Sequence, residues 1–521
     1  MRHGEDSVVV EALLAEFREL LGSEAVLTDV EEFCDPYDPT DLAHRPAAVV
    51  QPASVGEVQA IVRAAARYGV PIWVSSQGRN NGYGGSAPVL AGSVVVNLRR
   101  MNRILEVNER LGYVVVEPGV RFFDLVDHAE ATGGAWWPST PSLGWGSVVG
   151  NTVDHGFGST EFGDHAAAVA GLEVVLPDGS LLRTGMWASS TSTSYGTHPR
   201  GFGPNITPMF MQSNLGIVTK LARWVSPRPE SYAAVTAHAD DPDALAPLID
   251  ATELLVQEHT VRNIPNLTTS LGAAAMRAPR SHWTRAGVPM PDEDYRALCA
   301  ALGTGWYNLR LALYGPSAVV DAQLDRVRTV LSSAVPGVRI SVNRIRGEDV
   351  SDETVRTHAD RVQAGRPSMM MLETAKWWSD DGGHLELAPI APATGADAVR
   401  IADLLRPRLE AEGFDFWPSL YISGRSLMFL AVMNFDRHDP SRVQAAYRVA
   451  EGAIPALAEA GYSLYRGNIR HMDLIQSTYD FGDHAYRRFV EGIKDLLDPV
   501  GILAPGKQGI WPTRYRPEHR D

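Results

Sequence analysis

A glycine-rich segment that is followed at once by a strand limits the fold of this chain more than any other feature. The segment GRNNGYGGSAP, residues 78–88, contains Gly82, Gly84 and Ala87 in the spacing G-x-G-x-x-[GA]. In a Rossmann fold this spacing opens a long helix, and the helix N-terminus holds a pyrophosphate. Here Pro88 follows and a strand is predicted a few residues later, so no helix fits. The pattern therefore excludes nicotinamide binding on a Rossmann half.

The residues before this loop predict a βαβ unit. Residues 46–50 form a short apolar strand, and Ser54 with Glu57 matches a capping box at the start of a helix. The helix is predicted to end at Gly69, and the next strand runs into the loop. Such a unit implies a parallel pair of strands with a right-handed crossover. Further segments follow, namely strands at 93–98, 113–120 and 214–226, a helix at 121–134 and a hairpin at 171–185.

Two interpretations of the loop remain open from the residues alone. Consecutive backbone N–H groups in a glycine-rich turn bind anions, and Arg79 with two asparagines adds donors. The alternative is a tight structural loop. A second glycine-rich stretch, residues 141–159, would let the backbone approach a flat or phosphorylated ligand closely. Two such loops favour one extended cofactor over two separate features.

The pattern changes after Pro227. Residues 305–346 and then 384–460 each predict strands that alternate with single helices, which is typical of a mixed α+β domain with an antiparallel sheet. The chain has 521 residues, too many for one compact core, so at least two domains are expected.

Composition excludes several classes of function. The net charge of −15 argues against nucleic acid or an anionic membrane as the main partner. The two cysteines, Cys34 and Cys299, form no C-x-x-C motif, so a zinc ribbon or thiol redox site is not expected, and no metal is predicted. No signal peptide and no membrane-spanning run is recognised, and a cytoplasmic protein is expected.

Motifs spread over nearly the whole chain resemble the FAD-dependent vanillyl-alcohol oxidase family of para-substituted phenol oxidases. They are GRNNGYGGSAP, MNRILEVNE, LGWGSVVGNT, GLEVVLPDG, RTGM, RGFGPN, SNLGIVTK, GGHLELAPIAP, LYRGNIRHMD and DPVGILAPGKQGIWP. The resemblance implies a two-domain α+β fold of the p-cresol methylhydroxylase type. An FAD-binding domain over 1–226 would be completed by a C-terminal segment over 462–521. A cap domain over 227–461, with a mixed or antiparallel sheet covered by helices, would hold the substrate.

The resemblance also implies cofactor and substrate residues. His384 matches the residue that is joined covalently to the flavin. The other cofactor positions are Ser76, Gln77, Gly78, Arg79, Asn80, Asn81, Pro141, Gly146, Ser147, Gly150, Asn151, Thr152, Gly216, Ile217, Val218 and Lys507. Tyr83, Tyr465 and Arg466 match a trio that binds a phenolate, and two phenolic donors with a guanidinium suit an anionic oxygen. The pocket positions are Phe157, Ser159, Trp417, Ser419 and Tyr421.

One position departs from the family pattern. Ser142 stands where the family usually has an aspartate near flavin N5, and a serine cannot act as a carboxylate base. Glu386 is a candidate replacement, because residues i and i+2 of a strand face the same side and Glu386 should point where His384 points. The alternative is a solvent-facing glutamate on an edge strand.

The function predicted from the resemblance is oxidation of a para-substituted phenol by FAD, with O₂ as the electron acceptor. Alternatives are a dehydrogenase or methylhydroxylase that uses a cytochrome or another acceptor, an oxidoreductase of 2-hydroxy acids, and a non-enzymatic flavin-binding protein. The predicted partners are a small phenolic substrate and O₂, and relatives of this kind suggest a homodimer or a larger homo-oligomer.

Overall fold

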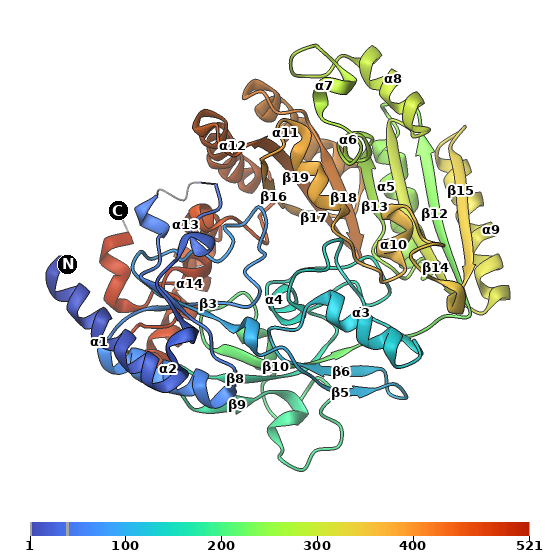
Figure 1. The fold of residues 1–521 in the computed structure, drawn as a ribbon. Coiled ribbons are helices and arrows are strands. Elements are labelled where there is room, and N and C mark those ends of the chain that lie inside the picture. Colours follow the sequence, from blue (N-terminus) through green and yellow to red (C-terminus); the bar gives the residue numbers. More distant parts are fainter. Residues whose placement is uncertain (1–2, 38–40, 520–521) are drawn as a thin grey trace.

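Four sheets organise the computed structural model, which describes residues 3–37 and 41–519 (Figure 1). The first sheet has the order β1-β2-β4-β3, and β4 runs parallel to both β2 and β3. Its strands are β1 (Val26–Leu27), β2 (Ala48–Val50), β3 (Ile72–Ser75) and β4 (Val94–Asn97). The helices α1 (His3–Leu21) and α2 (Val55–Tyr68) share an apolar core with this sheet.

The predicted capping signals of α2 are confirmed. Ser54 accepts a hydrogen bond from the backbone N–H of Glu57, and Gly69 ends the helix with a φ of 65°. The βαβ prediction needs one correction. The strands β2 and β3 point the same way, but β4 lies between them, so they are not hydrogen-bonded neighbours. The glycine-rich loop belongs to the connection between β3 and β4. It therefore follows the end of β3 at the edge of the sheet where that strand finishes.

The second sheet is antiparallel, with the order β5-β6-β10-β8-β9. Its strands are β5 (Ile104–Asn108), β6 (Tyr113–Val116), β8 (Val169–Val175), β9 (Leu181–Arg183) and β10 (Ile217–Trp224). The helices α3 (Phe122–Ala131) and α4 (Val148–Val153) pack on it. A small sheet pairs β7 (Trp136–Trp137) with β11 (Ser226–Pro227).

A large antiparallel sheet forms the cap, and its main path has the order β15-β12-β14-β13-β18-β19-β16, with β17 also paired to β19. Its strands are β12 (Ser231–Ala239), β13 (Asn266–Thr269), β14 (Tyr307–Gly315), β15 (Arg339–Arg346), β16 (Gly382–Leu387), β17 (Ile390–Pro392), β18 (Pro418–Ser423) and β19 (Ser426–Asp436). One face packs on α5 (Leu245–Gln257), α9 (Ser317–Ala334), α11 (Gly395–Ala411) and α12 (Pro440–Glu459), and the apolar core of the cap lies between them. The predicted antiparallel α+β architecture is therefore confirmed.

The segment HLELAPI forms two strands instead of the single strand that the sequence suggests. Pro389 lies between β16 and β17 and has no N–H to donate to a ladder. Residues 463–465 run beside this break, where the N–H of Tyr465 donates to the carbonyl of Ala388 at 3.3 Å. The break thus seats Tyr465 close to the strand that carries His384 and Glu386.

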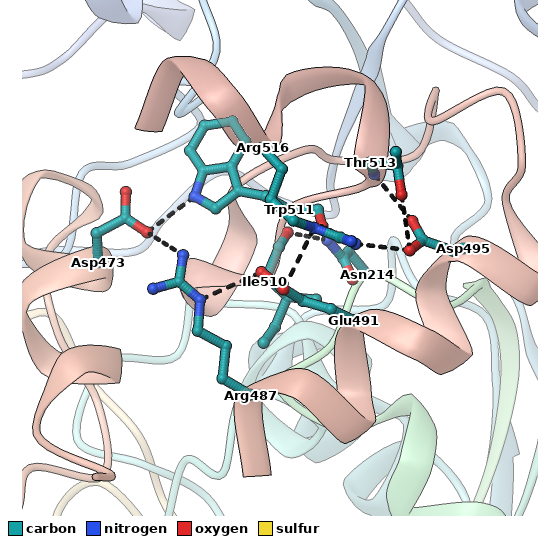
Figure 2. A network of polar contacts seen from close by, with 9 residues as sticks. All are labelled: Asn214, Asp473, Arg487, Glu491, Asp495, Ile510, Trp511, Thr513 and Arg516. Atoms are coloured by element: carbon teal, nitrogen blue, oxygen red, sulfur yellow. Dashed lines mark hydrogen bonds and ion pairs between the residues drawn. The ribbon is translucent and has the colours of Figure 1, made fainter. Parts of the chain in front are cut away.

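Six further α-helices belong to the described residues, and the C-terminal segment returns to the N-terminal part of the molecule (Figure 1). These helices are α6 (Leu271–Ala275), α7 (Arg280–Trp283), α8 (Asp292–Leu302), α10 (His358–Gln363), α13 (Met472–Ser477) and α14 (Phe481–Leu497). Figure 2 shows the polar network that fixes the tail, in which Arg516 bridges Glu491 at 3.2 Å and Asp495 at 2.7 Å. Among all the residues that the structure describes, no helix is long and apolar enough to cross a bilayer.

Candidate active site

A cavity of about 1070 Å³ lies between the N-terminal sheets, the cap sheet and the C-terminal tail. Pockets for small ligands usually measure roughly 300–1,000 Å³, so this space suits a dinucleotide together with a substrate. The glycine-rich loops line one wall and the strands of the cap line another. Every cofactor position predicted from the sequence lines this cavity except Thr152, which is buried beside it in α4.

The two glycine-rich loops are packed against each other. A Cβ atom on Gly150 would lie 2.3 Å from Oγ of Ser76, so only glycine lets the loops approach this closely. Ser147 caps the short helix α4 by accepting the N–H of Gly150, and its hydroxyl donates to the carbonyl of Pro118 at 2.6 Å. Asn97 donates to the carbonyl of Ser76 and fixes the first loop. Side by side, the loops form the backbone cradle that FAD requires, so the residues present fit this cofactor.

The C-terminal tail supplies the remaining cofactor wall. Asn214 donates to the carbonyls of Ala504 and Ile510, which ties the start of β10 to the tail. Lys507 lines the cavity with its amine 4.0 Å from Oδ1 of Asp154. The tail therefore lines the same cavity as the glycine-rich loops, and the division into domains stays a prediction.

His384 and Glu386 point into the cavity from the same face of β16, as the strand periodicity predicts. Nε2 of His384 lies 3.6 Å from Oε1 of Glu386. Burial lowers the pKa of His384, so its imidazole is neutral at pH 7. Glu386 accepts a hydrogen bond from the hydroxyl of Tyr83 at 2.7 Å and does not face open solvent, although β16 is the edge strand.

Tyr83, Tyr465 and Arg466 meet beside this pair. The guanidinium of Arg466 lies over the ring of Tyr83, 4.3 Å from its centroid. Burial, together with the nearby carboxylate of Glu386, raises the pKa of Tyr83 well above its usual value, and burial raises that of Tyr465 to about 12. Both phenols therefore stay protonated at neutral pH. Burial opposes the charge on Arg466, but Asp154 and the neighbouring phenols outweigh that effect and raise its pKa.

Arg466 is positioned by two groups and keeps N–H donors for a ligand. Its Nη2 donates to Asn80 and to Asp154, both at 3.1 Å. Its Nε is buried and has no hydrogen-bond partner among the described residues. A buried donor without a partner is costly, so this N–H indicates a place for an anionic oxygen.

Three positioning residues were not identified from the sequence. Asp154 lies in the second glycine-rich stretch and contacts Arg466 and Gln508, and its place in that stretch is the only signal that could have identified it. The hydroxyl of Tyr37 accepts the N–H groups of Gly82 and His384. Gln212, which has a φ of 45°, donates to the carbonyl of Tyr465 at 2.8 Å. The last two act on main-chain groups, and no sequence pattern marks such contacts.

Four of the five predicted pocket residues line the cavity. Phe157 packs on Tyr421 with ring centroids 4.5 Å apart, while Trp417 and Ser419 lie further along the sheet. Ser159 is buried outside the lining, where its carbonyl accepts from Asn263 and Tyr314. Ser142 lines the cavity, and its carbonyl accepts the N–H of Ser368 at 3.0 Å.

Comparison with known proteins agrees with this arrangement. Residues 46–185 match the model of an FAD binding domain. The flavoprotein subunit of the hydroxylating 4-cresol dehydrogenase of Pseudomonas putida is 30% identical over 505 residues, covering 95% of this chain and 94% of the relative. The solved structure of 4-ethylphenol oxidase from Gulosibacter chungangensis, in complex with isoeugenol, has a TM-score of 0.92 at 33% identity, over 98% of both chains. The structure of p-cresol methylhydroxylase with bound substrate has a TM-score of 0.90 at 28% identity, over 96% of this chain and 97% of the other.

Proposed function

Because this chain belongs to the vanillyl-alcohol oxidase and p-cresol methylhydroxylase family of FAD-dependent oxidoreductases, we propose that it oxidises para-substituted phenols with O₂ as acceptor. The substrates would be 4-alkyl or 4-allyl phenols and 4-hydroxybenzyl alcohols, including lignin-derived aromatics with guaiacyl or syringyl rings. The observation that carries this proposal is the buried cluster of Tyr83, Tyr465 and Arg466, which offers donors to one anionic oxygen inside the cavity.

The cluster would favour the ionised form of the substrate. A free phenol has a pKa of about 10 and is mostly neutral at pH 7. Oxidation at the para benzylic carbon is easier from the phenolate, because the product is then a neutral quinone methide and not a cation. Arg466 supplies positive charge and an N–H donor in a buried site, where both are worth more than in water. The residues of the two glycine-rich loops and the tail would hold FAD, which would supply a hydride acceptor and a route for the electrons to O₂, with hydrogen peroxide as the product.

Glu386 would move protons in this reaction. Since the hydroxyl of Tyr83 donates to Glu386, a phenol that donates to the oxygen of Tyr83 has a two-step path for its proton to a carboxylate. Replacement of the missing aspartate by Glu386 at the benzylic carbon stays a separate prediction, because Tyr83 holds this carboxylate at the phenolate end of the site. Ser142 lines the cavity and would take part only as a hydrogen-bonding group.

We also propose that His384 carries FAD covalently. The support is its neutral imidazole, which points into the cavity between Glu386 and Gly82. Acid precipitation of the protein would then keep the yellow colour in the pellet. A colourless pellet with free flavin in the supernatant would exclude the bond without changing the proposed reaction.

The principal alternative is transfer of electrons to a cytochrome or another acceptor, and the dehydrogenase name of the Pseudomonas relative favours it. Peroxide release during turnover of 4-ethylphenol, with no gain in rate from an added electron acceptor, would support the oxidase. Turnover that requires the acceptor would favour the dehydrogenase. A 2-hydroxy acid oxidoreductase is less compatible with the two tyrosines of the cluster. A homodimer or larger homo-oligomer and a cytoplasmic location stay predictions.

A further inference from the structure

The cavity has a polar arm that the proposed reaction does not use. Side chains on the cavity face of the cap sheet form two cross-strand rows. One row runs Tyr421, Asn266, Arg310, Thr236 and Ser341, and the other runs Ser419, Thr268, Asn308 and His238. The opposite face of the same strands is apolar and belongs to the core of the cap. A sheet face of this polarity, lining a cavity, indicates a surface for a polar ligand or for water.

Arg310 is the charged centre of this arm. Its side chain makes no ion pair or hydrogen bond among the described residues, and its Nε is buried without a partner. His358, at the start of α10, also lines the arm and is only 6% exposed. Neither of its ring nitrogens has a hydrogen-bond partner in the described part of the chain. Burial and the charges of Arg310 and Arg361 hold the pKa of His358 well below its usual value, so the ring is a neutral donor beside a cation.

Positive charge predominates among the charged side chains of the arm, because Arg277, Arg310 and Arg356 outnumber Asp360. The carboxylate of Asp360 accepts a hydrogen bond from Asn343 at 3.1 Å. Arg277 and Arg356 lie on the more exposed part of the lining. None of the predicted cofactor positions lies in the arm, since those residues come from the two loops, β10, β16 and the tail.

The arm lies within reach of the para substituent of a bound phenol. Tyr421, which packs on Phe157 in the substrate pocket, and Arg310 are both register partners of Asn266. Two inter-strand spacings, about 10 Å, therefore separate the backbones of Tyr421 and Arg310. The phenolate cluster lies on the β16 side of the pocket, so a para side chain that runs along the sheet from there would reach β14.

We propose that Arg310 and His358 form a carboxylate-binding subsite for para-substituted phenols whose side chain ends in an acid. This inference rests on the proposed phenol oxidation and adds the substrate class. Arg310 supplies a charge-assisted hydrogen bond and His358 a neutral one, and both buried donors become paired when the acid binds. The subsite takes no part in the hydride step, so Arg310 and His358 determine specificity and are not catalytic.

The test uses the holoenzyme and ω-(4-hydroxyphenyl)alkanoates of increasing chain length, each beside its methyl ester. Wild-type protein should show a lower KM for an acid than for its ester at one preferred length. Arg310→Gln should raise that KM by about 10-fold or more, with little change in kcat and no change for 4-ethylphenol. Arg328→Gln, which removes the same charge from an exposed position on α9, should leave both substrates unaffected.

Two outcomes would overturn the subsite. The first is a wild-type KM for the acid that is no lower than that for the ester at any chain length. The second is an equal rise of KM for acid and ester in Arg310→Gln. Calorimetry measures the affinity of the wild type for each acid and its ester directly. It therefore tests the subsite even if the variant alters the fold or no phenol is oxidised. If 4-ethylphenol is not turned over by the wild type, the proposed function fails. Tighter binding of the acid than of the ester, lost in Arg310→Gln, would still support the subsite.

Discussion

Glu386 is the residue whose role in this site is most open to test. Its carboxylate accepts the hydroxyl of Tyr83 at 2.7 Å and lies 3.6 Å from His384. Glu386→Gln keeps the shape but removes the proton acceptor, so turnover of 4-ethylphenol should fall on the order of 100-fold. FAD content, measured from the visible absorbance of the purified protein, should stay close to that of the wild type.

A matched control is Glu348→Gln, because Glu348 is exposed and lies in the loop after β15. An unchanged rate in Glu386→Gln would remove this carboxylate from the mechanism. A parallel loss of rate and FAD would assign it to cofactor binding instead.

For single residues, the sequence identified the functional side chains but not the residues that position them. His384, Tyr83, Tyr465 and Arg466 follow from motifs, and the same-side placement of Glu386 follows from strand periodicity. The partners Asp154, Tyr37 and Gln212 act through contacts between segments that are far apart in the chain. Asn308 and Arg310 alternate with leucines along β14, a period-two signal that was available but indicates no ligand by itself.

Among the loops and strands, the first glycine-rich loop lies directly against β16. Gly82 has a φ of 78°, and a Cβ there would lie 3.1 Å from Nε2 of His384. Gly82→Ala should therefore displace the imidazole and lower both FAD incorporation and the melting temperature.

Gly92→Ala is the control, because Gly92 has a φ of 75° and no atom within 4 Å of its Cβ position. It introduces the same backbone strain as Gly82→Ala without a contact to His384. Both variants should lose on the order of 1 kcal/mol through the left-handed backbone. Only Gly82→Ala should lose FAD. Equal FAD content in the two variants would contradict the proposed contact.

The turn after α14 depends on a buried ion pair. Lys494 is fully buried and lies 2.8 Å from Asp498, whose carboxylate also accepts the N–H groups of Gly501, Ile502 and Leu503. Asp498→Ala leaves a buried cation without its counter-ion and should cost roughly 3–5 kcal/mol of unfolding free energy. Denaturant unfolding measures this loss.

Asp325→Ala is the control for that measurement, since Asp325 is 82% exposed on α9. It should change the unfolding free energy by less than about 0.5 kcal/mol. A loss for Asp498→Ala no larger than that of the control would show that the pair does not stabilise the tail.

The elements that were predicted followed from capping residues and apolar periodicity, which are local signals. The strand order did not, since the position of β4 between β2 and β3 depends on pairing between distant segments. The break of HLELAPI at Pro389 could have been anticipated from the missing N–H. The strand β12 was not predicted, and its alanine-rich sequence has little of the β-branched character that marks a strand.

For the molecule as a whole, buried neutral histidines predict a loss of stability in acid. Burial, reinforced by Arg470, lowers the pKa of His471 to about 4, and the values for His165 and His358 are also well below normal. The unfolded chain binds these protons near pH 6.5 and the native protein does not. Stability is therefore full above about pH 6.5 and falls as the pH drops towards 4.

Melting temperatures measured between these limits test this expectation. His471→Gln should make the decline shallower, whereas His438→Gln, at an exposed position, should not. A decline of the same steepness in His471→Gln would exclude that imidazole as a source of the effect.

The central claim is that the bound substrate reacts as a phenolate held against FAD by Tyr83, Tyr465 and Arg466. Rapid mixing of the holoenzyme with 4-ethylphenol or with its methyl ether, without oxygen, tests this most directly through the loss of oxidised-flavin absorbance. Rapid bleaching by the phenol and none by the ether is the predicted result. Equal bleaching by both compounds, or none by the phenol, would contradict the account.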